Sequence, residues 1–199
     1  MWSFNRLKDG NSIVTENLIW NGPFGWPTYE KDNKSKMPDI EGMYLFTFPY
    51  NDGYVLYCAG ITNSTKKRLN THTREYRKGN YNVLNVNSAL QGEREEIWHG
   101  WQYAKEHRDE FMLKKENILK EVENQLEAFR IFVSEVKDVR KRERLEAAIM
   151  QNLYMSKEFY AELADRGMAL RARYNSEMPI SIDNHFSVKM YGIPQLLEI

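Results

Sequence analysis

The chain has 199 residues, 28 acidic and 28 basic side chains, and a single cysteine. This length fits one domain with elaborations, or at most two small domains, and one cysteine excludes an internal disulfide framework. The zero net charge excludes a general basic field for nucleic acid. No apolar run is long enough to cross a membrane and the N-terminus lacks a signal-peptide core, so we expect a cytoplasmic protein.

An irregular aromatic arm is expected over residues 1–41. This segment combines tryptophan, phenylalanine and tyrosine side chains with glycine and proline, and only 13–20 has the pattern of a short strand. The rings could stack on nucleic-acid bases or could cover a sheet. We favour the covering role because nothing spaces the rings as a stacking platform.

Residues 42–61 have the pattern of a β-hairpin. Between 43 and 48 successive side chains alternate between two faces, which is strand periodicity. The sequence Asn-Asp-Gly at 51–53 favours a tight turn, because Asp-Gly tolerates the positive φ that a hairpin turn needs. Residues 54–61 are again aromatic and β-branched and are expected to form the second strand.

A basic helix is predicted after the hairpin. Ser64 or Thr65 can cap it, and Arg68 lies four residues before His72, so these two side chains share one helix face. A guanidinium and an imidazole beside Tyr44 are groups suited to phosphate chemistry. The basic side chains of this helix can also neutralise DNA phosphates, although a solvated face is the commoner role of such a run; those assigned to DNA are Lys66, Lys67 and Arg74.

The order of these residues resembles the GIY-YIG nuclease family, and the matching positions are Gly42-Met43-Tyr44, Gly60, Arg68 and His72. The resemblance implies that Tyr44 is the general base, that Arg68 stabilises the transition state, and that His72 takes up or relays the proton. The family's second tyrosine falls by count on Cys58. It is therefore either replaced by Cys58 or supplied by the adjacent Tyr57, if a bulge turns that side chain to the same face.

Residues 79–127 exceed the compact form of this family and are expected to be an insertion. A short strand is predicted at 81–86, and Trp98 and Trp101 are expected to anchor the segment. The pattern over 101–126 is helical, with lysine and glutamate interleaved, and predicts one long solvated helix or two helices in sequence.

Residues 129–136 return to strand periodicity and are expected to complete an antiparallel sheet with the hairpin. Asp138 can cap a helix that runs to about residue 155, with Glu146 in the middle of its apolar face. A carboxylate there is costly unless it is paired or binds a metal. Glu146 could pair with Arg142, but the resemblance makes it the residue that holds one Mg²⁺ or Mn²⁺, and we favour this role because the other motif residues are also present.

The chain beyond residue 155 carries fewer signals. Residues 156–173 are expected to be helical with an interruption near Gly167, and 185–190 is a possible strand. The family often places an asparagine after the glutamate helix. Asn175 is our candidate for a catalytic asparagine, and Asn184 is the rival.

These observations predict an α+β fold in which a small three-stranded antiparallel sheet is flanked by helices. The arm covers 1–41, the nuclease domain 42–175 with its insertion at 79–127, and a C-terminal tail 176–199. The expected function is a metal-dependent DNA endonuclease that cuts one strand per site, so that double-strand cutting needs a homodimer or two binding events. The alternative is a non-catalytic DNA-binding or protein-interaction module on the same fold. An RNA substrate also stays open, since nothing here reads a 2′-hydroxyl.

Overall fold

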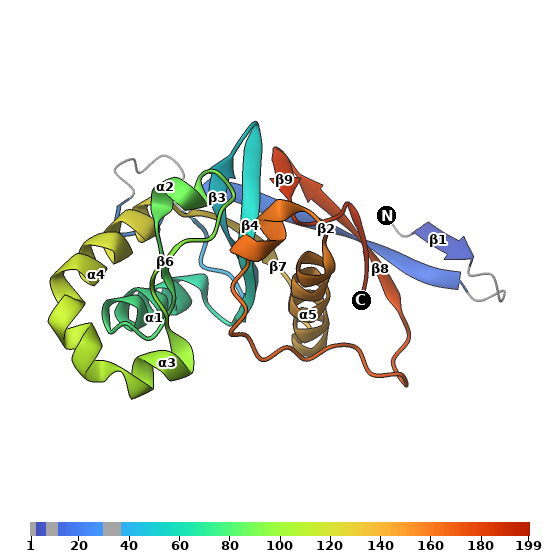
Figure 1. Cartoon of the computed structure of the whole chain (residues 1–199). Coiled ribbons are helices and arrows are strands. Elements are labelled where there is room, and N and C mark those ends of the chain that lie inside the picture. Colours follow the sequence, from blue (N-terminus) through green and yellow to red (C-terminus); the bar gives the residue numbers. More distant parts are fainter. Residues whose placement is uncertain (1–2, 7–11, 30–36) are drawn as a thin grey trace.

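A computed structural model describes residues 3–6, 12–29 and 37–199, and it has an α+β fold as expected. Within these ranges eight strands form one curled sheet (Figure 1). Their bounds are β1 Ser3–Arg6, β2 Ser12–Phe24, β3 Gly42–Tyr50, β4 Gly53–Thr62, β7 Arg130–Glu135, β8 Ile180–Phe186, β9 Lys189–Tyr191 and β10 Leu196–Glu198. A separate two-stranded sheet pairs β5 Val83–Leu84 with β6 Glu96–Trp98.

The strand order is β10-β8-β2-β7-β3-β4-β9, with β1 paired to β2 alone. Neighbours are antiparallel except for β2 with β8 and β4 with β9. The prediction of a small three-stranded sheet is therefore wrong, although β7, β3 and β4 do form an antiparallel centre. The reason is edge pairing: β2 bonds to the outer side of β7 and β9 to the outer side of β4, which satisfies backbone groups that a three-stranded sheet would leave open.

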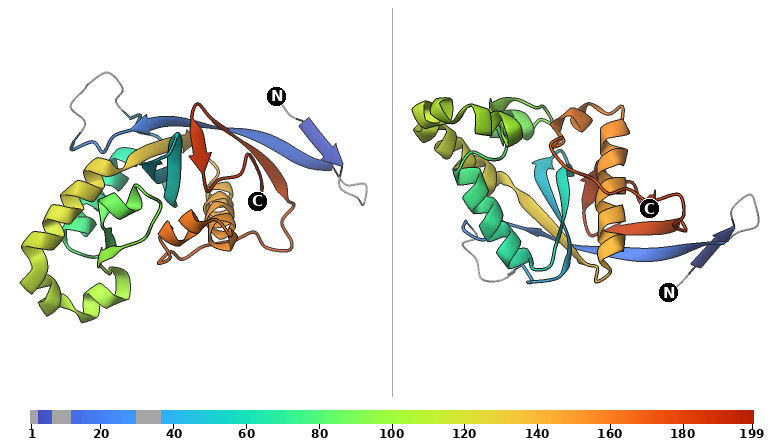
Figure 2. Two further views of the ribbon diagram at one scale, coloured as in Figure 1. Left: turned by 45° about the horizontal axis from the view of Figure 1, so that its top comes forward. Right: turned by 90° about the horizontal axis from the view of Figure 1, so that it is seen from below.

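The helices of the described residues lie against this sheet or beside it. Their bounds are α1 Thr65–Arg77, α2 Val86–Ala89, α3 Trp101–Glu106, α4 Arg108–Ala128 and α5 Val139–Met155, with a short 3₁₀ helix η2 at Phe159–Leu163. Seen from below in Figure 2, α1 and α5 stand on the two sides of the β3–β4 hairpin. None of the helices in the described ranges combines the length and the apolar character needed to cross a membrane.

The predicted helix starts are confirmed. Ser64 precedes α1, and its side chain accepts a hydrogen bond from the backbone N–H of Lys67 at 3.2 Å. Asp138 does the same for Lys141 at the start of α5, at 2.8 Å. The helical pattern over 101–126 forms two helices in sequence, with the break at His107.

The predicted helix over 156–173 is wrong. Only η2 is helical there, and the rest of the segment is extended or irregular. Its backbone groups bond to other parts of the chain in place of an intrahelical ladder. The N–H of Asp165 donates to the carbonyl of Tyr57 at 2.9 Å, and Arg94 Nη1 donates to the carbonyls of Leu163 and Ala164 at 2.9 and 3.0 Å.

Aromatic rings of the N-terminal segment pack on the sheet. Trp26 is 1% exposed and lies 5.1 Å from the ring of Phe46 and 5.9 Å from that of Phe129. Trp20, in β2, stacks on Phe186 of β8 at 5.7 Å. These rings form part of the core, as the covering role predicts, whereas Trp2 lies outside the described residues.

Candidate active site

The structure brings Tyr44, Arg68 and His72 into direct contact. Tyr44 lies on β3, and the other two project from one face of α1 because they are four residues apart. Tyr44 Oη is 2.9 Å from His72 Nε2, and Arg68 Nε donates a hydrogen bond to the same oxygen at 3.1 Å. A tyrosine, an arginine and a histidine from the predicted set thus form one hydrogen-bonded group.

Gly60 makes room for the Tyr44 ring. The two residues are cross-strand partners of β3 and β4. A Cβ at position 60 would lie 2.2 Å from both Tyr44 Cζ and Tyr44 Oη, closer than real side chains approach. Glycine is therefore required here by close approach rather than by backbone conformation.

Burial sets the protonation of this group. Tyr44 is 4% exposed, and burial raises its pKa, while the Arg68 charge partly offsets that rise. Burial, together with the Arg68 charge, lowers the pKa of His72 to about 3. His72 is thus neutral at physiological pH. Its Nδ1 is buried without a partner in the described part of the chain, and a lone pair there is less costly than an N–H. We therefore assign the imidazole proton to Nε2, which donates to Tyr44 Oη.

Glu146 lies on α5, is half-buried, and is close enough to Arg68 for the two charges to interact. Burial raises its pKa to about 7, against the Arg68 charge and a hydrogen bond from the Ile61 backbone, which lower it. The pairing of Glu146 with Arg142 is not formed. Arg142 instead donates to the Thr62 carbonyl at 2.6 Å and pairs with Glu41 at 2.8 Å. Within the described residues no cation lies within ion-pair distance of Glu146.

The donors present are compatible with a single Mg²⁺ or Mn²⁺. No group of three His, Cys, Asp or Glu side chains suited to a metal occurs in the described ranges. Mg²⁺ commonly keeps several waters and binds through one or two carboxylates together with substrate phosphate. An unpaired carboxylate such as Glu146 meets that requirement.

A bulge in β4 sets the directions of the side chains of Tyr57 and Cys58, the two candidates for the second tyrosine position. Phe46 pairs with Cys58 and Thr47 with Leu56, which leaves Tyr57 as the extra residue. Tyr57 consequently faces the same side as Cys58, but its ring packs 5.9 Å from Phe48 and 5.5 Å from Phe129, in the core. Cys58 lines the cavity beside Tyr44, and burial raises its pKa, so it is a thiol at neutral pH.

That cavity has a volume of about 50 Å³. Tyr44, Arg68 and His72 form one wall, and residues from distant segments, among them Trp101 and Asp165, form another. Sequence reasoning missed Asp165, because it follows η2 in a stretch without periodicity and carries no local signal of its role. Trp101 was expected only as an anchor.

The remaining predicted residues lie apart from this group. Asn175 is exposed and makes no hydrogen bond in the described structure, while its rival Asn184 is buried between Trp20 Nε1 and the Pro194 carbonyl. The DNA-binding candidates lie on the exposed side of α1 and are Lys66, Lys67 and Arg74. Arg74 pairs with Glu75 at 3.1 Å and borders an open groove of about 480 Å³.

No protein-family model matches this chain, and neither the curated proteins nor the solved structures contain a significant match.

Proposed function

We propose that the protein is a metal-dependent endonuclease that hydrolyses phosphodiester bonds in DNA, a divergent member of the GIY-YIG type. One observation carries the proposal: Tyr44 Oη contacts both His72 Nε2 and Arg68 Nε, with the unpaired carboxylate of Glu146 close enough to influence the pKa of Tyr44. A structural role requires no such set of groups around one phenol.

The four side chains of the proposed site differ in how deeply they are buried. Arg68 and Glu146 are half-buried and face the solvent side, where a phosphate can reach them, whereas Tyr44 and His72 lie deeper. Tyr44, once its own hydroxyl proton has left, accepts a proton from the attacking water, and His72 and Arg68 both donate to Oη and stabilise the negative charge of the phenolate. The planar guanidinium of Arg68 also neutralises charge that develops on the phosphate oxygens.

Glu146 is the residue that would hold Mg²⁺ or Mn²⁺, and such an ion would neutralise charge at the phosphate and the leaving oxygen. The basic side of α1 would contact the DNA backbone without reading sequence. Lys66 and Lys67 at its start, and Arg74 along it, are exposed and available for this contact. One such site cuts one strand, so cleavage of both strands would require a homodimer or two binding events.

The test is cleavage of supercoiled plasmid in Mg²⁺ or Mn²⁺. Wild type is expected to nick the plasmid, and Glu146→Gln, Tyr44→Phe and Arg68→Ala are each expected to lose at least about 100-fold in rate. Glu116→Gln and Tyr174→Phe are matched controls, because both side chains are exposed and lie outside the site, and they should cut like wild type. Cleavage that persists in all three site variants would refute the assignment.

A non-catalytic DNA-binding module is the second candidate, favoured by the enclosure of the site. Tyr44 is 4% exposed and His72 8%, and the position of the second tyrosine holds a buried thiol. On this reading wild type binds DNA without cutting it in either metal. Binding in a gel-shift assay that is lost in Lys66→Ala with Lys67→Ala, without any cleavage, would favour the module over the nuclease.

A further inference from the structure

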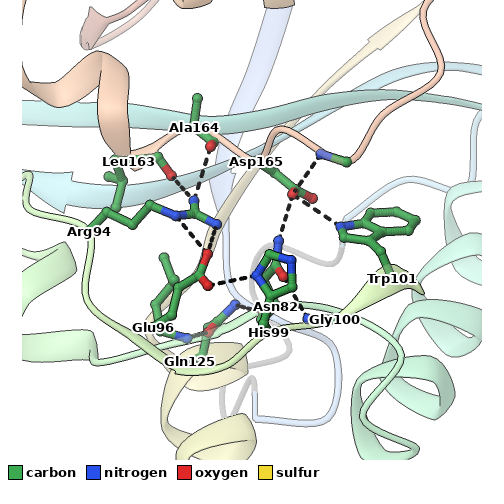
Figure 3. A network of polar contacts seen from close by, with 12 residues as sticks. Asn82, Arg94, Glu96, His99, Gly100, Trp101, Gln125, Leu163, Ala164 and Asp165 are labelled. Carbon is green, nitrogen blue, oxygen red and sulfur yellow. Dashed lines mark hydrogen bonds and ion pairs between the residues drawn. The ribbon is translucent and has the colours of Figure 1, made fainter. Parts of the chain in front are cut away.

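Asp165 lies where three segments meet beside the cavity. Its Oδ1 accepts hydrogen bonds from Asn82 Nδ2 at 3.0 Å, Trp101 Nε1 at 3.4 Å and the Gly167 N–H at 3.4 Å (Figure 3). Its own backbone N–H donates to the carbonyl of Tyr57. In the described structure all the donors to this carboxylate meet Oδ1, so Oδ2 is left to accept from another group.

The surroundings hold Asp165 firmly. Arg94 donates hydrogen bonds to the carbonyls of Leu163 and Ala164, the two residues before Asp165, and pairs with Glu96 (Figure 3). Trp101 has φ of +55°, in the left-handed region that tryptophan rarely adopts, and its backbone N–H bonds to Asn80. A Cβ on Gly167 would lie 2.2 Å from the Trp101 indole nitrogen. This packing fixes the carboxylate in one place.

Asp165 also lines the cavity of about 50 Å³, together with Tyr44 and Arg68. A space of this size holds at least one water molecule, which contacts the polar groups of its wall. Among the described residues that line it, Asp165 is the only carboxylate. It is also bonded through its backbone to Tyr57, next to the strand position where the second tyrosine was expected.

A hydrolytic step at Tyr44 needs a place for the proton. Burial, ahead of the Arg68 charge, lowers the pKa of His72 to about 3, so His72 is a poor acceptor. Burial raises the pKa of the Cys58 thiol, which therefore stays protonated. Burial also raises the pKa of Asp165. The hydrogen bonds from Gly167 and Trp101 lower this pKa but do not cancel the rise, so Asp165 is a stronger base than an ordinary aspartate.

We propose that Asp165 is the terminal proton acceptor of the hydrolytic step and takes the place of the second tyrosine; this rests on the proposed nuclease function. With His72 and Arg68 donating to Oη, the hydroxyl hydrogen of Tyr44 is free to point into the cavity. The Tyr44 hydroxyl proton first passes through a cavity water to Asp165 Oδ2, and the resulting phenolate, to which His72 and Arg68 donate, then takes one proton from the attacking water. The water oxygen bonds to phosphorus, the bond from phosphorus to the leaving oxygen breaks, and that oxygen takes a proton from solvent. Asp165 then returns its proton to solvent.

The test is Asp165→Asn, which preserves shape and the acceptor toward Asn82 but removes the base. Single-turnover cleavage of labelled DNA at saturating Mn²⁺ is expected to fall about 100-fold or more, with the Kd for DNA within twofold of wild type and an unchanged circular dichroism spectrum. Asp109→Asn, exposed on α4, is the control. Cleavage within threefold of wild type would overturn the role of Asp165 and leave the nuclease standing, whereas no cleavage by wild type would overturn both.

Trp101→Phe provides a second test if Asp165→Asn does not fold. It keeps a ring against Gly167 but removes one donor to Oδ1. Because saturating Mn²⁺ keeps Glu146 deprotonated, the fall of the cleavage rate at low pH reports the protonation of Asp165. Loss of one hydrogen-bond donor to Oδ1 raises the pKa of Asp165, so this fall should move up by about half a pH unit. An unmoved limb would overturn the proposal. Titratable groups that couple to Asp165 come from all the elements around it and are Arg94, Cys58, Tyr57, Tyr76, Tyr81 and Tyr154.

Discussion

Replacing Glu146 by glutamine is expected to stabilise the metal-free protein at pH 8. Burial raises the pKa of this carboxyl from its ordinary 4.5 to about 7, so the folded state resists its ionisation. Each pKa unit corresponds to about 1.36 kcal/mol, which places the full penalty at about 3.4 kcal/mol. Because the side chain is only half-buried, we expect about 1 to 3 kcal/mol.

The sign follows from proton linkage. Between pH 4.5 and about 7 the folded state binds more protons at Glu146 than the unfolded state, so stability is full below pH 4.5 and falls as pH rises through 7. Glutamine cannot ionise and carries none of this loss. The gain in free energy of unfolding should therefore be large at pH 8 and below about 1 kcal/mol at pH 5.

Urea unfolding in a chelator at the two pH values measures this difference. Glu116→Gln, exposed on α4, should change stability by the same small amount at both. An equal gain for Glu146→Gln at pH 5 and pH 8 would refute the reasoning. Adding Mg²⁺ at pH 8 should stabilise wild type but not Glu146→Gln, because ligand binding to the folded state alone adds stability. Equal stabilisation of both proteins would exclude Glu146 as the metal ligand.

Three further predictions concern the same region. Gly60→Ala should lower the free energy of urea unfolding by more than about 2 kcal/mol, because the added methyl group clashes with the Tyr44 ring. In a Tyr44→Ala background the same substitution should cost much less, and additive costs of the two substitutions would contradict this. Burial lowers the pKa of His72 to about 3, so His72→Gln should flatten the loss of stability as pH falls from 6.5 toward 3, whereas an unchanged pH slope would contradict a neutral buried imidazole. Arg142→Ala should lower the free energy of unfolding by about 3 kcal/mol, because it leaves the Thr62 carbonyl and Glu41 without their partner. A melting temperature within about two degrees of wild type would contradict this.

Local signals located much of the site in advance. The alternation of 43–48, the Ser64 cap and the spacing of Arg68 and His72 each depend on residues close in sequence, and the structure has a strand, a helix start and a shared helix face there. Glu146 stood out because a carboxylate on an apolar face needs an explanation, although its relation to Arg142 was not predictable from spacing.

The residues that sequence reasoning missed depend on long-range contacts. Asp165 lines the same cavity as Tyr44 because hydrogen bonds to Arg94 and Tyr57 hold its segment against the sheet. Tyr57, by contrast, is predicted on condition of a bulge, and the pairing of β4 with β3 determines that the bulge forms.

The sequence by itself determined the α+β class, the hairpin, the starts of α1 and α5, and the helix face shared by Arg68 and His72, because each follows from periodicity, spacing or capping within a few residues. Only the tertiary structure decided the size of the sheet and the far wall of the cavity. Pairing of β2 with β7 and of β9 with β4 joins segments far apart in the chain, and the choice among open strand edges is made by backbone hydrogen bonding and packing over the whole fold.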